Sequence, residues 1–286
     1  SPLLQQVSPM TEAERAEAQP KIAILEAART RYGVDAVKRL EHPIRAASGL
    51  EPPADTGDVL RYPDGLFIRG ITSAAWHSRR WMPDVAIMEA AANDMRAELQ
   101  TLLKTRGAFQ PFDEGDYGFN PTNTEGQWNV FYVVLGCREV PGVANICPKT
   151  AAALKSLPNL GMAGMFSALT AGTHLWAHCG PTNAVISLSM GLIVPPGCVI
   201  RVGKEERTWE EGKCLVFDDT YEHEVWNRGT GTRFIMLVDV WHPELTPIER
   251  QILGEVLWSP GEVEGRLQQG RAALAGTKWW EPTAAR

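Results

Sequence analysis

Two histidine-containing stretches, Trp-Ala-His-Cys-Gly-Pro-Thr-Asn (176–183) and Phe-Asp-Asp-Thr-Tyr-Glu-His-Glu-Val-Trp (217–226), frame the part of the chain that decides the fold. Apolar runs rich in Val, Ile, Leu and Phe lie between and after them, at 184–194, 198–202, 214–217 and 233–240. Gly and Pro separate these runs, whose lengths are typical of β-strands. Several short strands joined by such turns favour a sandwich or a jelly-roll barrel.

His178 and His223 stand near opposite ends of this set of strands, so a closed barrel can bring them together. Imidazole is a good ligand for iron, copper, zinc and nickel. The usual oxygen-activating iron site adds one carboxylate to two histidines. The position where that carboxylate normally follows the first histidine is Gly180, which has no ligand atom. The residues alone therefore indicate an incomplete metal site.

Four segments carry a resemblance to a known family. They are His-Cys-Gly-Pro-Thr-Asn (178–183), Thr-Trp-Glu-Glu-Gly-Lys (208–213), the second histidine stretch, and Val-Asp-Val-Trp-His-Pro-Glu-Leu-Thr-Pro (238–247). Together they resemble the aspartyl/asparaginyl β-hydroxylase family. The resemblance is strongest over residues 167–250 and extends more weakly back to Tyr62.

The resemblance implies a mainly β protein with flanking helices (α+β), built on a double-stranded β-helix of the jelly-roll or cupin-like kind. It implies an Fe(II)- and 2-oxoglutarate-dependent oxygenase, in which two histidines hold the iron and a Gly replaces the carboxylate. His178, Gly180 and His223 match that pattern. These two histidines are therefore the expected metal ligands; the alternative is a pair of hydrogen-bonded core histidines.

Arg233 begins a run that is otherwise apolar, and on a strand it shares a face with Ile235 and Leu237. If that face points inward, the buried guanidinium needs an anion, and a carboxylate is its natural partner. The alternative is an arginine at a strand edge with its head in water. The resemblance implies that Arg233 binds the distal carboxylate of 2-oxoglutarate and that Ser167 assists.

The sequence departs from the family on the strand after the first histidine. An Arg and a His two positions apart commonly stand there, whereas this chain has Ser187 and Ser189. Hydroxyl groups are weaker anion ligands than charged groups. Either the other cosubstrate ligands suffice, or a basic residue such as Arg201 or Arg207 substitutes, or the cosubstrate or the reaction has changed.

Asp218 and Asp219 precede His223 closely. A carboxylate beside a two-histidine metal can bond a metal-bound water or orient a ligand imidazole. Asp219 is the stronger candidate, and a turn aspartate between strands is an equal alternative.

The expected function is hydroxylation of an unactivated carbon, in first place a β-carbon, of a small amino-acid-like or peptide substrate with dioxygen, in a biosynthetic pathway. Halogenation, desaturation, cyclisation or a reaction without 2-oxoglutarate are alternatives on the same iron site. A metal-binding jelly-roll module without turnover is an alternative of another class. A zinc hydrolase is least favoured, because no third ligand is in register.

Composition supports these expectations. The chain has 286 residues and a formal net charge of −6, so it carries no basic footprint for nucleic acid. Its five cysteines form no CxxC pair, which is typical of a reducing compartment. No apolar run is long enough to span a membrane, and no signal peptide is evident. We expect a cytoplasmic protein; the sequence does not indicate its oligomeric state.

Three parts are expected: an N-terminal helical and wrapping extension (1–61), the oxygenase β-helix domain (62–250) and a C-terminal helical tail (251–286). Helical spacing of apolar residues predicts helices over 21–40, 85–105, 148–157, 247–257 and 261–274. Gly33 is expected to interrupt the first of them and Pro43 to end it. Residues 49–65, rich in Gly, Pro and Asp, are expected to form a wrapping loop.

Overall fold

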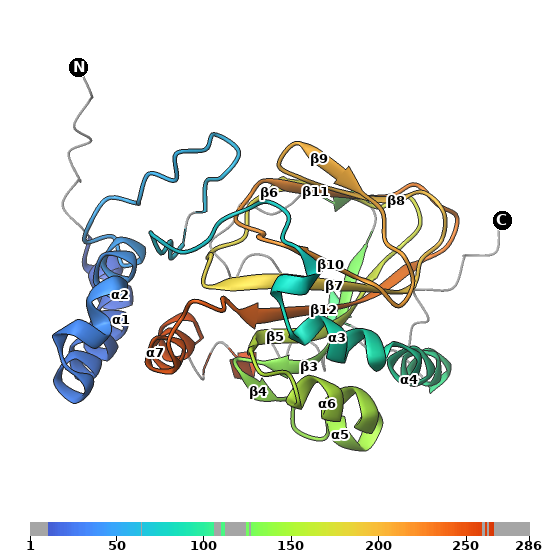
Figure 1. Ribbon diagram of the computed structural model, residues 1–286, viewed down its shortest axis with the longest axis horizontal. Coiled ribbons are helices and arrows are strands. Elements are labelled where there is room, and N and C mark those ends of the chain that lie inside the picture. The colour runs from blue at the N-terminus through green and yellow to red at the C-terminus, as the bar shows by residue number, and fades with distance from the viewer. Residues whose placement is uncertain are drawn as a thin grey trace.

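The structure, a computed structural model, describes residues 11–63, 65–105, 110–111, 124–125, 127–258, 261 and 263–265. Within these ranges the strands form two antiparallel sheets (Figure 1). One sheet has the order β1-β3-β5-β12-β7-β10, with β4 beside β3, and the other has the order β2-β6-β11-β8-β9. This arrangement confirms the expected jelly-roll barrel with flanking helices.

The strands are β1 (Gln110–Pro111), β2 (Thr124–Glu125), β3 (Trp128–Leu135), β4 (Arg138–Glu139), β5 (Leu160–Leu169), β6 (His174–His178), β7 (Val185–Ile193), β8 (Cys198–Val202), β9 (Glu205–Arg207), β10 (Cys214–Phe217), β11 (His223–Asn227) and β12 (Arg233–Trp241). The helices are α1 (Glu12–Tyr32), α2 (Val34–Ala47), the 3-10 turn η1 (Arg79–Trp81), α3 (Asp84–Ala90), α4 (Ala92–Thr105), α5 (Val143–Ile146), α6 (Pro148–Lys155) and α7 (Pro247–Leu257).

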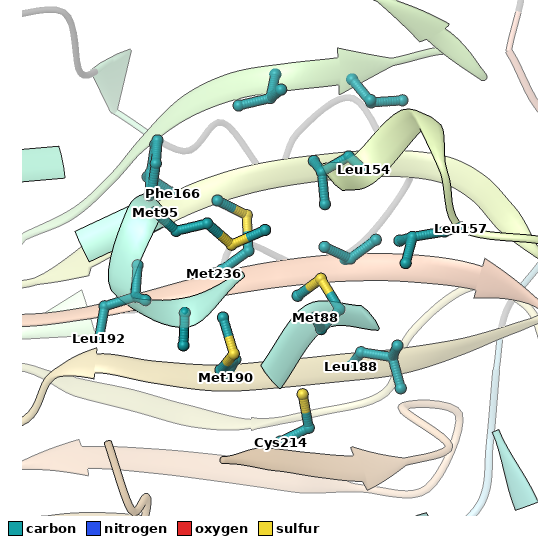
Figure 2. Close-up of a cluster of buried hydrophobic side chains, with 14 of the residues drawn as sticks. Met88, Met95, Leu154, Leu157, Phe166, Leu188, Met190, Leu192, Cys214 and Met236 are labelled. Carbon is teal, nitrogen blue, oxygen red and sulfur yellow. The ribbon is translucent and has the colours of Figure 1, made fainter. Parts of the chain in front are cut away.

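The larger sheet has two chemically different faces, because successive side chains on a strand point to opposite sides. On β7, Leu188 and Met190 belong to a buried apolar cluster, together with Met236 of β12. Helices α3, α4 and α6 cover this face, and their Met88, Met95 and Leu154 fill the same cluster (Figure 2). The apolar stripe of residues 85–105 therefore packs on the outside of the barrel. The residues of β7 that alternate with Leu188 and Met190 point into the barrel.

A second apolar cluster lies between the two sheets. It includes Leu169, Ile200, Val225 and Ile235 from four different strands. This apolar layer lies between the sheets, next to the polar side chains that point into the barrel.

A third cluster joins parts of the chain that are far apart in sequence. Helices α1 and α2 pack beside α7 at one end of the larger sheet (Figure 1). Leu40 of α2, Trp241 of β12 and Leu253 of α7 share this core. Residues of all three expected parts thus share one apolar core, and the division into parts stays a prediction.

Two helix predictions were wrong in their boundaries. The first helix begins earlier than expected and continues through Pro43 to Ala47, whereas its expected interruption at Gly33, where φ is 88°, is confirmed. The helix over 85–105 is split at Ala91 into α3 and α4. The wrapping loop is confirmed over the described residues 49–63 and 65, and the predicted helix over 261–274 lies largely outside the described residues.

No helix among the described residues has the length and apolar character needed to cross a bilayer.

Candidate active site

The two predicted metal ligands lie side by side. Strands β6 and β11 are antiparallel neighbours, and His178 stands directly opposite His223 in their register. Residues paired in this way have their Cβ atoms only about 5 Å apart. The two imidazole rings accordingly have centroids 4.1 Å apart, with an angle of 55° between their planes. The strand register therefore brings together two groups that are distant in the sequence.

Each imidazole is oriented by a main-chain carbonyl two residues earlier. The Nδ1 atom of His178 lies 2.7 Å from the carbonyl oxygen of Trp176, and that of His223 lies 3.0 Å from the carbonyl oxygen of Tyr221. Because a carbonyl can only accept, Nδ1 must carry the hydrogen in both rings. The lone pair is then on Nε2, which is the usual arrangement of a metal-ligating histidine.

Burial also favours the neutral form that a metal requires. It lowers the pKa of His178, against the opposing effect of the Trp176 carbonyl and nearby glutamates. The pKa of His223 lies well below its ordinary value, first because the ring is buried and second because His178 is adjacent.

Gly180 has no room for a side chain, because the Asp219 carboxylate occupies that space. A Cβ built on Gly180 would lie no farther than 2.5 Å from the three carboxylate atoms of Asp219. The Gly180 amide also donates a 2.6 Å hydrogen bond to the Asp219 carbonyl. The carboxylate of Asp219 thus stands where the side chain of a third ligand would begin.

Asp219 is poorly satisfied inside the protein. Its Oδ1 atom is buried and has no hydrogen-bond partner among the described residues. Burial raises the pKa of Asp219 well above its usual value, and the Asp239 and Asp218 carboxylates raise it further, while a hydrogen bond with Ser187 lowers it. In the described part of the chain, no group of three His, Cys, Asp or Glu residues is placed to hold a metal ion.

Arg233 lies buried at the other end of the interior. It is 2% exposed, and its guanidinium carbon lies 4.8 Å from the ring centre of Trp209. Its Nη2 is 3.4 Å from the Ser167 hydroxyl, and its Nε has no partner. Burial lowers the pKa of Arg233 to about 10. None of the ion pairs between described residues involves this guanidinium, so within the described part of the chain it is a buried cation without an anion.

The serines divide between the two ends of the site. Ser167 accepts a 2.9 Å hydrogen bond from the Trp128 indole, and Ser189 accepts one of 2.8 Å from the Trp209 indole. Ser189 is thereby joined to the ring beneath Arg233, whereas Ser187 lies close enough to Asp219, near the histidines, to lower the pKa of its carboxyl. Two residues along a strand cover about 7 Å. Ser187 therefore marks the histidine end of the site and Ser189 the arginine end.

Neither arginine suggested as a substitute cation reaches the interior. Arg201 points outward from β8, where it bonds Glu222 at 2.8 Å and Glu224 at 2.9 Å. Arg207 bonds Glu205 and stacks over Trp76. The structure therefore removes the explanation in which one of them replaces the missing Arg and His.

A sequence model of the aspartyl/asparaginyl β-hydroxylase family matches residues 89–243, more than half of the chain. The chain belongs to this family. Mouse aspartyl/asparaginyl β-hydroxylase is 40% identical over 160 residues, which are 54% of this chain and 21% of the mouse protein. The ornithine lipid ester-linked acyl 2-hydroxylase of Rhizobium tropici is 37% identical over 169 residues, 58% of this chain and 59% of that protein. Thus the chain spans about a fifth of the mouse β-hydroxylase.

Among solved structures, a prolyl hydroxylase from Trichoplax adhaerens in complex with a hypoxia inducible factor peptide fragment resembles this β-hydroxylase family member over 59% of its chain and 82% of the other. The identity is 12% and the TM-score is 0.41.

Sequence reasoning missed two residues of this family member's site. Asp239 faces Ser187 across the β7–β12 pair, and burial raises the pKa of this carboxyl to about 7. The alternation that placed Arg233 on an inward face also places Asp239 there. Trp209 was seen only as part of a motif; its contact with Arg233 has no local signal, because it depends on how the loop before β10 folds back.

Proposed function

We propose that this chain is an Fe(II)- and 2-oxoglutarate-dependent oxygenase that hydroxylates an unactivated carbon of an amino-acid-like or peptide substrate. One observation carries the proposal: a buried arginine without an anion and a pair of oriented, neutral histidines line the same small barrel. Family membership supports the chemistry, since the related proteins are hydroxylases by name.

The residues fit an iron ion with two protein ligands. Nε2 of His178 and of His223 would hold the metal, and the absence of a third side-chain ligand leaves coordination positions for cosubstrate and dioxygen. Iron and 2-oxoglutarate, when bound, supply the chemistry that activates dioxygen, which is the oxidant for hydroxylation of an unactivated carbon.

The protein's own residues then bind and orient. Arg233 would bind the distal carboxylate of 2-oxoglutarate with Ser167, which satisfies a guanidinium that is otherwise a buried unpaired charge. Asp219 would act beside the metal as a hydrogen-bonding carboxyl at the position that Gly180 leaves open. The indoles of Trp128 and Trp209 keep the serine hydroxyls in place and exclude water from the arginine end.

Ser187 and Ser189 leave the keto-acid end of 2-oxoglutarate without a protein cation. We propose that the metal provides most of the binding at that end and that the Ser187 hydroxyl contributes a weaker hydrogen bond. The names of the relatives refer to aspartyl and asparaginyl groups in one case and to a lipid acyl chain in another. The substrate panel must therefore cover both.

The first test is an anaerobic Fe(II) titration with 2-oxoglutarate, in which the visible charge-transfer band is recorded. The native protein should show the band, and His178→Ala should lose it. His174→Ala is a matched control, because His174 lies on the same strand but bonds Glu224 on the outer face at 2.7 Å. Retention of the band in His178→Ala, or its loss in both variants, would contradict the proposed ligand set.

The second test measures succinate release with free amino acids, Asp- and Asn-containing peptides and an ornithine lipid that carries an ester-linked acyl chain. A product heavier by one oxygen identifies hydroxylation, whereas a chlorinated or a dehydrogenated product identifies the alternative reactions. If iron binds but the charge-transfer band does not form, the chain does not use 2-oxoglutarate.

A further inference from the structure

We propose that a segment preceding the matched family region is a working part of the site, and that its Arg61 is a positioning residue for His223. The segment comprises residues 60–63 and 65–77 and is called the strap below. The proposal deepens the proposed function, on which its cosubstrate readout rests. Residues 89–243 match the family model, so the strap lies outside that match.

Arg61 is buried against the loop that leads into β11. Its side chain is 5% exposed, and Nη2 donates to Asp218 Oδ2 at 2.5 Å while Nε donates to Thr220 Oγ1 at 2.8 Å. The guanidinium carbon also lies 4.6 Å from the ring centres of both Phe67 and Tyr221. One side chain of the strap thus holds three residues of the 218–221 loop.

This loop determines the orientation of the second metal ligand. The carbonyl of Tyr221, whose ring packs on Arg61, accepts the hydrogen bond from Nδ1 of His223 at 3.0 Å. Asp219, which fills the space beside Gly180, lies between the two loop residues that bond Arg61. A displacement of the guanidinium would therefore move both the imidazole's acceptor and the carboxylate.

Further contacts fasten the strap to the same loop. The Glu222 amide donates to the Leu60 carbonyl at 2.6 Å, and the Tyr62 hydroxyl donates to the Glu222 carboxylate at 2.5 Å. At its far end the strap pairs Trp76 with Phe217 in an antiparallel bridge.

The strap also touches the loop that follows the first ligand. Leu66 forms a parallel bridge with Thr182. The Ile68 amide donates to Oδ1 of Asn183, and Nδ2 of Asn183 donates to the Ile68 carbonyl, both at 2.8 Å. A single segment therefore braces the chain on both sides of the His178–His223 pair.

Stability alone does not account for the Arg61–Asp218 pair. Burying two charges costs desolvation energy that their attraction roughly offsets, so a buried ion pair gives little net stability compared with an apolar pair. What such a pair does provide is one fixed geometry, since the guanidinium has directional donors. That geometry is transmitted to the ligand loop.

The test compares Arg61→Lys with a matched control, Arg39→Lys. Arg39 also forms a two-pronged pair, with Glu249 at 2.8 and 2.5 Å, but it joins α2 to α7 away from the histidines. Measured for each protein are the free energy of unfolding in urea, the Fe(II) affinity by quenching of tryptophan fluorescence, and the visible band with 2-oxoglutarate.

Arg61→Lys should weaken Fe(II) affinity by about 10-fold or more, in the range seen when groups that orient metal ligands are removed, and should shift or weaken the band. Arg39→Lys should lose stability but keep the native affinity and band. If both variants lose stability and both keep native Fe(II) affinity, Arg61 is only structural and the proposal is overturned.

Tyr62→Phe decides the matter if Arg61→Lys does not fold. Tyr62 is 51% exposed and the substitution removes only the contacts of its hydroxyl with Glu222 and Cys179, so folding should survive. Weaker Fe(II) binding in this variant supports the strap, and native binding overturns it. A native protein that binds Fe(II) without giving the band would refute the proposed cosubstrate, while the Fe(II) affinities would still test the strap.

Discussion

A methyl group at Gly180 should destabilise the protein and disturb the metal site at once. The new Cβ would lie within 2.5 Å of all three atoms of the Asp219 carboxylate, whereas ordinary contacts are about 3.5–4 Å. Gly180 is not in the left-handed region, so Gly180→Ala adds no backbone strain and the cost comes from the overlap. Overpacking of this kind costs about 1–3 kcal/mol, and Asp219 must move to relieve it.

The assay is urea unfolding of the metal-free protein, followed by Fe(II) titration. Gly231→Ala is the matched control, because a Cβ there meets only Pro195 at an ordinary 3.8 Å. Gly180→Ala should lose about 1–3 kcal/mol relative to this control. Gly180→Asp should not strengthen Fe(II) binding, although it adds the carboxylate that other iron oxygenases use, because two carboxylates would compete for one space.

The double variant Gly180→Asp with Asp219→Gly separates crowding from charge. It empties the space that the new side chain needs, so stability should recover relative to Gly180→Asp alone, and the two effects should not be additive. The reasoning is refuted if Gly180→Ala is as stable as Gly231→Ala and binds Fe(II) like the native protein.

Three further predictions concern the interior and its outer face. Arg233→Met should raise the KM for 2-oxoglutarate about 10- to 100-fold without lowering the unfolding free energy, because it removes a charge-assisted contact together with a buried unpaired cation; a loss of stability with an unchanged KM would contradict this. The raised pKa of Asp239, about 7 against a usual 3.8, means that the folded state holds a proton that the unfolded state has lost between these pH values. Stability of the metal-free protein should therefore fall as pH rises from about 4 to about 7, by at most about 4 kcal/mol, and pH-dependent urea unfolding should show a smaller fall in Asp239→Asn. Leu188→Ala removes part of the apolar cluster between β7 and helices α3, α4 and α6, so it should lower the free energy of unfolding in urea by about 2–5 kcal/mol. It should leave the KM for 2-oxoglutarate unchanged, and a changed KM would show that the two faces of β7 are coupled.

The barrel and its histidine pair could be predicted because their signals are local. Gly- and Pro-bounded apolar runs predict strands, and the alternation along β7 and β12 correctly separated Ser187 from Leu188 and placed Arg233 on the face of Ile235. Helix ends were less predictable, since Pro43 lies within α2, where packing on α1 and α7 outweighs its local effect.

The relation between Gly180 and Asp219 could not be read from the sequence, nor could the burial of Arg61. Both depend on a loop closing against residues that are distant along the chain, and neither spacing nor hydrophobicity records such a contact. Asp219 had two equal interpretations before the structure, and the space left by Gly180 favours a carboxylate beside the proposed metal ligands.

The two faces of the larger sheet keep the residues that line the site apart from the residues that stabilise the fold. On β7, residues that line the site alternate with residues that fill the core, so Ser187 and Ser189 share a strand with Leu188 without sharing its neighbours. Replacement of an Arg or a His by Ser on the inward face would change which ligands the barrel accepts. It would leave the packing against α3 and α4 intact. One scaffold can thereby diversify its substrates through substitutions that are nearly neutral for its stability.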